Sequence, residues 1–197
     1  MRHSDTLSLD PFEALQETTR QHLRRHGCGA YTYSDGSLPG VLAAAVGAQR
    51  IVEVGTALGY TACWLASASD TTLVDTIEND PDHVELARAE VSRYGLGDRV
   101  AVHHGEAEAV LAGLDEAVYD VAFFDGFAPT IAVLGLLRAR LRPGGLLIAA
   151  NLTLGGAGAV RTELADASRW RTHSFGETAL AVKTTQPTTP APTKDES

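Results

Sequence analysis

The sequence is poor in cysteine and in positive charge. It contains two cysteines, Cys28 and Cys63, and neither has a second cysteine at the spacing of a zinc ribbon or a redox pair. We therefore expect two reduced thiols among apolar neighbours. The chain has 16 Lys and Arg against 25 Asp and Glu, a net charge of −9. This balance argues against nucleic acid or an anionic membrane as a partner, because both are bound by clustered cations.

Long apolar runs are also missing. No segment approaches the roughly 18–20 apolar residues that cross a bilayer, and residues 1–10 lack the apolar stretch of a signal peptide. These absences predict a cytoplasmic protein. The chain has 197 residues, of which 44% are hydrophobic, and this predicts a single core.

Apolar strand patterns alternate with amphipathic segments. Asp10 before Pro11 predicts the start of a first helix, and Gly27 its end. Asp80–Pro81 and Gly95 bound another helix in the same way. Residues 31–40 are rich in turn-forming residues and are expected to form a loop. The remaining helices are expected at 41–48, 60–68, 107–114, 130–141 and 161–168. The strands are expected at 50–55, 72–78, 100–105, 119–126, 144–151, 170–175 and 178–184.

This order predicts an α/β fold. Repeated strand–helix units favour a Rossmann-like, doubly wound, mostly parallel sheet of seven strands with helices on both faces. The last two strands flank Gly176 and Glu177, which predicts a C-terminal antiparallel hairpin. We divide the chain into a loose segment and helix (1–27), a main domain (28–185) and a disordered tail rich in Pro and Thr (186–197).

The first strand ends in a glycine turn, residues 55–61. Gly55 and Gly59 permit a tight turn whose backbone amides could meet a ligand at a helix start. Glu53 lies inside an apolar strand, where a carboxylate needs a partner. A cationic or donor-rich ligand would supply one. The alternative is that the glycines only pack strand against helix and that Glu53 caps nearby backbone.

The second strand ends in Glu78, roughly 20 residues after the glycine turn, a position suited to accepting hydrogen bonds from both hydroxyls of a ribose. The alternative is an exposed charge at a strand end. The third loop, His103 to Ala107, would then lie where an adenine binds. Glu106 could accept a hydrogen bond from its amino group.

Four segments together resemble a known family. IVEVGTALGYTACWLA, TIENDPDHVELARAEV, YDVAFFDG and LRPGGLLIAANLTLGG look, in this order, like the motifs of class I S-adenosylmethionine-dependent methyltransferases. Within that class they resemble the small O-methyltransferases that include the catechol and caffeoyl-CoA enzymes. The likeness runs from about Tyr31 to Lys183, and makes 28–185 a methyltransferase domain.

The resemblance implies S-adenosylmethionine as cofactor and S-adenosylhomocysteine as product. Glu53 and the 55–59 turn would hold the methionine end, Glu78 the ribose and loop 105–107 the adenine. Asp125 would face the methionine amino group or the reacting centre. The implied cofactor-binding set is Glu53, Gly55, Thr56, Gly59, Tyr60, Thr61, Glu78, Asn79, Gly105, Glu106, Ala107 and Asp125.

The chain departs from the metal-dependent members of that family. In those enzymes a Lys follows the strand-four Asp by three residues, and strand five ends in Asp-Asn. Here Ala128 and Ala150–Asn151 occupy these places. Mg²⁺ prefers near-octahedral oxygen coordination, and one carboxylate with one amide holds it poorly. We therefore predict no tightly bound metal and no metal-ligating residues.

Methyl transfer can proceed without a metal, by in-line SN2 displacement accelerated through positioning. The candidate catalytic residues are Asp125 and Asn151, although each could instead serve the turn in which it lies. The candidate substrate-lining residues are Tyr31, Tyr33, Asp35 and Phe127. The two tyrosines could equally pack the N-terminal helix.

The function expected is therefore a metal-independent O-methyltransferase for a small-molecule acceptor. Transfer to nitrogen, the use of another adenosyl-type ligand, and a non-catalytic protein that binds S-adenosylmethionine as a partner or regulator remain alternatives. The resemblance also implies a homodimer. No residue pattern identifies the acceptor.

Overall fold

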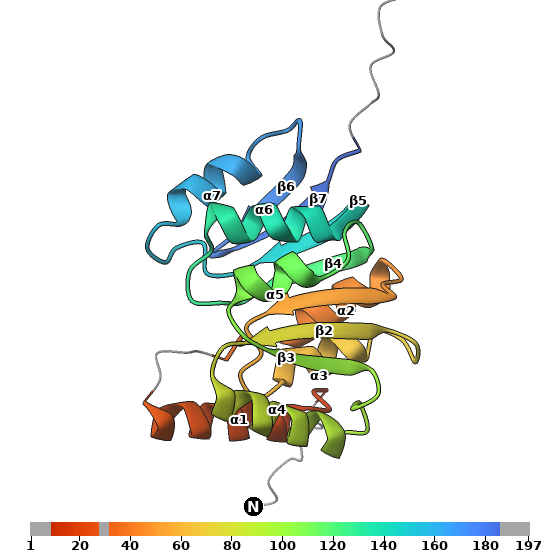
Figure 1. Ribbon diagram of the computed structural model, residues 1–197, viewed down its shortest axis with the longest axis vertical. Coiled ribbons are helices and arrows are strands. Elements are labelled where there is room, and N and C mark those ends of the chain that lie inside the picture. Colours follow the sequence, from red (N-terminus) through yellow and green to blue (C-terminus); the bar gives the residue numbers. More distant parts are fainter. Residues whose placement is uncertain (1–8, 28–31, 186–197) are drawn as a thin grey trace, which may run out of the picture.

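The structure is a computed structural model that describes residues 9–27 and 32–185 (Figure 1). One sheet contains seven strands in the order β3-β2-β1-β4-β5-β7-β6. The first five in this order are parallel, whereas β7 is antiparallel to both β5 and β6. The predicted fold class is confirmed. The strands are β1 (Arg50–Val54), β2 (Leu73–Glu78), β3 (Val100–His104), β4 (Tyr119–Phe124), β5 (Leu141–Ala149), β6 (Trp170–Phe175) and β7 (Thr178–Lys183).

Helices cover both faces of the sheet. Alternate residues of a strand point to opposite faces, and in β1 Ile51 packs in one hydrophobic cluster while Val52 packs in the other. No helix in the described ranges is long and apolar enough to cross a membrane. The first cluster includes residues of α1 (Glu13–His26), α2 (Ser37–Ala45), α3 (Tyr60–Ala66) and α4 (Pro81–Arg93), and the second includes residues of α5 (Ala107–Gly113), α6 (Ile131–Arg140) and α7 (Ala157–Leu164).

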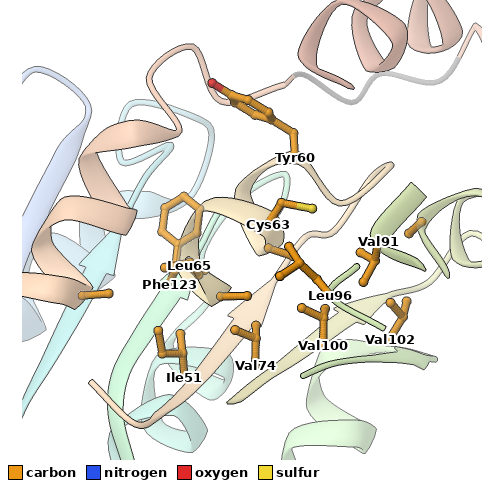
Figure 2. Packing of buried hydrophobic residues seen from close by; sticks show 14 of the residues in the cluster. Ile51, Tyr60, Cys63, Leu65, Val74, Val91, Leu96, Val100, Val102 and Phe123 are labelled. Carbon is orange, nitrogen blue, oxygen red and sulfur yellow. The ribbon is translucent and has the colours of Figure 1, made fainter. Parts of the chain in front are cut away.

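The larger cluster packs α3 against the centre of the sheet (Figure 2). Ile51, Val74 and Phe123 face it from three strands, and Leu65 and Cys63 face it from α3. Cys63 is a fully buried free thiol, as predicted, and burial raises its pKa to about 12. Cys28 lies outside the described residues, as do the predicted disordered tail and residues 1–8.

Three helices have other bounds than predicted. Helix α1 begins at Glu13 rather than Pro11, because the Asp10 carboxylate accepts a hydrogen bond from the Phe12 amide and forms a turn before the helix. Helix α7 begins at Ala157 and ends at Leu164, earlier than the predicted 161–168. Helix α2 runs from Ser37 to Ala45 rather than over 41–48. Its first turn lies in a segment that we expected to be a loop.

Gly40 explains why the start of α2 was predicted too late in the sequence. A Cβ there would lie 2.8 Å from the Trp64 carbonyl oxygen, and one at Gly36 would lie 2.5 Å from the Tyr60 ring. Both glycines thus permit the close approach of α2 to α3. Gly40 has a packing role inside a helix, where the sequence alone favoured a loop.

This close approach can be tested by substitution. Gly40→Val should lower the free energy of unfolding by roughly 1–3 kcal/mol, because the new side chain meets the α3 backbone, which cannot move without displacing the core. Gly135→Val in α6 is the matched control, since a Cβ there meets no atom within 4 Å. Urea unfolding would measure both. Equal effects in the two variants would contradict the packing role.

Candidate functional site

A cavity of about 480 Å³ opens at the carboxyl ends of β1, β2, β4 and β5. Parallel strands bring their carboxyl ends to one sheet edge, which is where α/β proteins bind ligands. The loops after these strands form most of the wall, and Thr19 of α1 also contributes. The predicted site residues that line the cavity are Tyr33, Gly55, Thr56, Tyr60, Thr61, Glu78, Asn79, Gly105, Glu106, Ala107, Asp125, Phe127 and Asn151.

Three predicted site residues do not line the cavity. Glu53 is completely buried behind the wall. Gly59 precedes α3 with a φ of 92° and shapes the turn. Asp35 is exposed and accepts a hydrogen bond from Ser37 at the start of α2, 2.5 Å away. Tyr31 lies outside the described residues.

Gly55 permits β1 and β4 to approach each other at the cavity floor. Its φ is 98°, a left-handed value that favours glycine. A Cβ there would lie 2.7 Å from the Asp125 carbonyl oxygen. The Asp125 amide in turn donates to the Val54 carbonyl at 2.8 Å. The absence of a side chain at Gly55 therefore allows the Asp125 backbone to lie against the first loop.

The Glu78 carboxylate organises two loops of the wall. One oxygen accepts from the Ala57 amide at 2.8 Å, and the other accepts from the amides of Asn79 and Asp80, both at 3.0 Å. Glu78 is only 9% exposed, so the alternative of an exposed strand-end charge is wrong. The carboxylate lies at the cavity wall already oriented by three backbone donors.

Glu53 finds its partners inside the protein. The hydroxyls of Thr61 and Thr76 donate to its two oxygens, the second at 2.6 Å. Because the Thr76 hydroxyl has one proton and gives it to Glu53, the Thr56 hydroxyl donates to Thr76, 2.6 Å away. Thr56 and Thr61 line the cavity, so Glu53 orients two hydroxyls there. Burial raises the pKa of Glu53 to about 7, while the hydrogen bonds from the two hydroxyls act to lower it.

Asp125 and Asn151 lie together at the ends of β4 and β5. The Asn151 Nδ2 atom donates to Asp125 Oδ1 at 3.3 Å and to the Gly126 carbonyl at 2.7 Å. Burial, reinforced by the charge of Glu53, raises the pKa of Asp125 to about 8, while the Asn151 hydrogen bond opposes the shift. With this pKa, the protonated form of the Asp125 carboxyl group is favoured at neutral pH.

These residues do not fit the catalytic Mg²⁺ site of the metal-dependent family members. The Gly126 carbonyl can only accept, so the amide nitrogen of Asn151 faces Asp125 and Gly126. A metal ion would need the amide oxygen there. Ala128, at the place of the family's Lys, lines the cavity with a methyl group only.

Two aromatic residues, Tyr33 and Phe127, also line the cavity. The Tyr33 ring packs edge-to-face on Phe123, with 5.3 Å between centroids, and its hydroxyl lies 3.5 Å from that of Thr178. Phe127 lines the cavity and is 76% exposed. Sequence reasoning missed Thr19, Thr32, Val133 and Leu154, which also line it. Thr19 is buried on α1, and it reaches the cavity only through the docking of that helix.

Solved structures share this fold. An O-methyltransferase from Bacillus cereus in complex with S-adenosylhomocysteine superposes with a TM-score of 0.77 and 25% identity, over 89% of this chain and 93% of that one. The O-methyltransferase TomG from Streptomyces achromogenes, in complex with S-adenosylmethionine, gives a TM-score of 0.76 and 27% identity, over 86% and 89%. The fold is therefore the Rossmann-like fold of class I methyltransferases.

Sequence comparison gives the family. A "Methyltransferase domain" profile matches residues 52–151, from within β1 to the second residue after β5. A protein of Mycobacterium sp. (strain JLS), named as a candidate O-methyltransferase, is 34% identical over 149 residues, 73% of this chain and 67% of that protein. A homologue from Mycobacterium tuberculosis (strain ATCC 25177 / H37Ra) is 35% identical over 66% of this chain and 59% of its own length. The chain belongs to the methyltransferase-domain family and spans about two thirds of the length of these relatives.

The buried Glu53 makes stability depend on pH. Its pKa is about 7 in the folded protein and 4.5 as its ordinary value, so between these values the folded state holds a proton that the unfolded state has lost. Stability attributable to Glu53 therefore falls as pH rises through this window, by about 3 kcal/mol. Glu53→Gln should gain stability relative to wild type between pH 4.5 and 7, as measured by urea unfolding.

Asp120→Asn is the matched control. Hydrogen bonds from Arg142 and from the amides of Arg50 and Gln49 outweigh its desolvation and lower the pKa of Asp120. Its ionised form is therefore favoured throughout the window, and its removal should cost the same stability at both ends. A Glu53→Gln variant with an equally flat difference would contradict the raised pKa.

Proposed function

We propose that the protein is an S-adenosylmethionine-dependent O-methyltransferase that acts on a small molecule without a catalytic metal. The observation that carries this proposal is the continuity of the cavity. It runs from Glu78 and loop 105–107, where a nucleoside would bind, to Asp125, Asn151 and Phe127, where an acceptor would enter. The names and bound molecules of the Bacillus and Streptomyces proteins support this reading.

The cavity residues fit the cofactor. Glu78 has lone pairs left after its three backbone bonds, and these can accept from ribose hydroxyls. The backbone amides of the glycine turn would border the methionine carboxylate, because the hydroxyl protons of Thr56 and Thr61 are donated to Thr76 and Glu53. Asp125, with Glu53 behind it, provides negative charge for the methionine ammonium group. S-adenosylmethionine supplies an activated methyl group on a positively charged sulfur.

The raised pKa of Asp125 is compatible with two roles in the proposed reaction. A cation beside it favours the ionised form, so binding would release its proton. Alternatively, a carboxylate with a pKa near 8 can accept the proton of an acceptor hydroxyl, since such a pKa is close to working pH. Asn151 fixes the orientation of the carboxyl group in either case. The remaining acceleration comes from holding the acceptor in line.

The alternatives make different predictions in two measurements. Calorimetry with S-adenosylmethionine tests the binding that all enzyme readings require, and absence of heat at high micromolar concentration would reject the proposed function. Methyl transfer to a panel of phenols, carboxylates and amines then separates oxygen acceptors from nitrogen acceptors. Binding without transfer to any of them favours a non-catalytic protein. The homodimer and the small-molecule acceptor are predictions that oligomeric-state and activity measurements would check.

Glu78 provides the sharpest test of the binding mode. Glu78→Gln should weaken S-adenosylhomocysteine binding by about 1–3 kcal/mol, because it removes charge-assisted hydrogen bonds to the ribose. Glu85→Gln, on the exposed face of α4, is the matched control. Calorimetry on both variants would measure the difference. Unchanged affinity in Glu78→Gln would place the ribose elsewhere.

Metal independence is tested separately. After treatment with a chelator and its removal, activity with and without added Mg²⁺ should differ by less than about twofold, because the Asp125–Asn151 pair does not provide the oxygen ligands that Mg²⁺ requires. Restoration of lost activity by Mg²⁺ would show that the pair rearranges into a metal site.

A further inference from the structure

Three histidines from two helices meet outside the cavity. His22 and His26 are four residues apart on α1, and therefore lie on one face of that helix. His83 is the third residue of α4 and is 3% exposed. The centroids of the three rings lie 5.0–5.2 Å from one another.

The ring nitrogens converge. One nitrogen of each histidine lies within 4.8 Å of the others. In a tetrahedral zinc site, with Zn–N bonds of about 2.0 Å, ligand nitrogens lie roughly 3.3 Å apart. The cluster therefore needs a contraction of about 1.5 Å or less to close on an ion, which small side-chain rotations achieve. Two histidines at this spacing on one helix face are a recurrent zinc-binding arrangement.

A carboxylate lies beside one member of the cluster. Asp80 groups with His26 and Asp82 rather than with all three histidines, and it would have to move closer to His22 and His83 to act as a fourth ligand. Asp80 Oδ2 lies 3.9 Å from His26 Nε2, while Asp80 Oδ1 accepts from the amides of Asp82 at 2.9 Å and His83 at 3.2 Å. The helix start thus holds one oxygen and leaves the other directed at the cluster. Asp82 is also 3.9 Å from His26, but its side chain is 78% exposed, against 27% for Asp80.

One nitrogen of the cluster is buried without a partner. His22 Nε2 has no hydrogen-bond partner among the residues that the structure describes. Such a group costs free energy unless something binds it. An imidazole nitrogen in this position can offer its lone pair to a metal ion.

We propose that His22, His26, His83 and Asp80 bind a Zn²⁺-class transition-metal ion that joins α1 to the start of α4. Three imidazoles and one carboxylate suit Zn²⁺ or Co²⁺ rather than Mg²⁺ or Ca²⁺, which prefer oxygen ligands. Four protein ligands fill a tetrahedral site, so its role would be structural. We predicted no metal-ligating residues from the sequence. The histidine site differs from the Asp125–Asn151 position in both place and chemistry.

The proposed metal site lies next to residues that line the cavity. His83 Nδ1 lies 3.9 Å from Glu78 Oε1. Thr19, one turn before His22 on α1, lines the cavity. A metal ion here would therefore fix the position of α1, and with it one wall of the cavity. Metal binding itself does not rest on the proposed function.

The test uses the full chain, stripped of metal with a chelator and dialysed. Titration with Zn²⁺ against a chromophoric competitor should show one equivalent bound per chain, and Co²⁺ should give the intense visible absorption of a tetrahedral site. His26→Gln and His22→Gln should each weaken Zn²⁺ binding at least tenfold, by the usual effect of losing a ligand or its support. Zn²⁺ should raise the Tm of wild type and not that of His26→Gln.

His173→Gln is the matched control, because His173 is an exposed histidine on β6, away from the cluster. It should bind Zn²⁺ as wild type does. Circular dichroism would confirm that each variant is folded, and His26 is exposed enough to be replaced without opening the core. Absence of a one-equivalent site, or equal affinities for His26→Gln, His173→Gln and wild type, would overturn the proposal.

Discussion

The candidate site depends on the hydrogen bonds that the Glu78 carboxylate accepts from backbone amides. The carboxylate accepts hydrogen bonds from the Ala57 amide of the first loop and from two amides of the second. The Glu78 backbone carbonyl accepts a hydrogen bond from the Gly105 amide of the third loop at 2.9 Å. One residue at the end of β2 thus connects three segments that converge only in the folded sheet. Its charge is satisfied within the wall, and the orientation is set before any ligand arrives.

Buried carboxyl groups give the cavity its electrostatic character. Glu53 lies behind the wall and Asp125 in it, and each has a raised pKa chiefly because of burial. Threonine hydroxyls and an asparagine amide stabilise them, with no cation among the partners found for either side chain. Such a site binds a positively charged ligand more favourably than a neutral one of the same shape. A methyl donor with a sulfonium centre is positively charged there, whereas its demethylated product is not.

Much of this arrangement follows from local sequence. Apolar strands of period and length suited to two-sided burial predicted the sheet, and the strand-end positions of Gly55, Glu78 and Asp125 predicted where a cavity would form. The partners of Glu53 were not predictable in this way, because Thr76 comes from a neighbouring strand and acquires its role only through the parallel register with Glu53.

The histidine cluster escaped sequence reasoning for a similar reason. His22 and His26 are visible as a pair, but nothing local places α1 beside the start of α4. Thr19 joined the cavity through the same docking of α1. Helix α2 was misjudged because glycine has two physical uses: it can end a helix, or it can let a helix approach a neighbour, as Gly40 does.

The contact between α2 and α3 has a consequence for divergence within the family. Gly36 and Gly40 have no side chains because the ring of Tyr60 and the backbone and ring of Trp64 occupy that space. At Gly36 a larger residue requires a smaller side chain at Tyr60 or Trp64, whereas at Gly40 the Trp64 carbonyl oxygen blocks a side chain whatever residue occupies position 64. Tyr60 also lines the cavity. Selection on the binding pocket therefore extends to Gly36, which lies outside it.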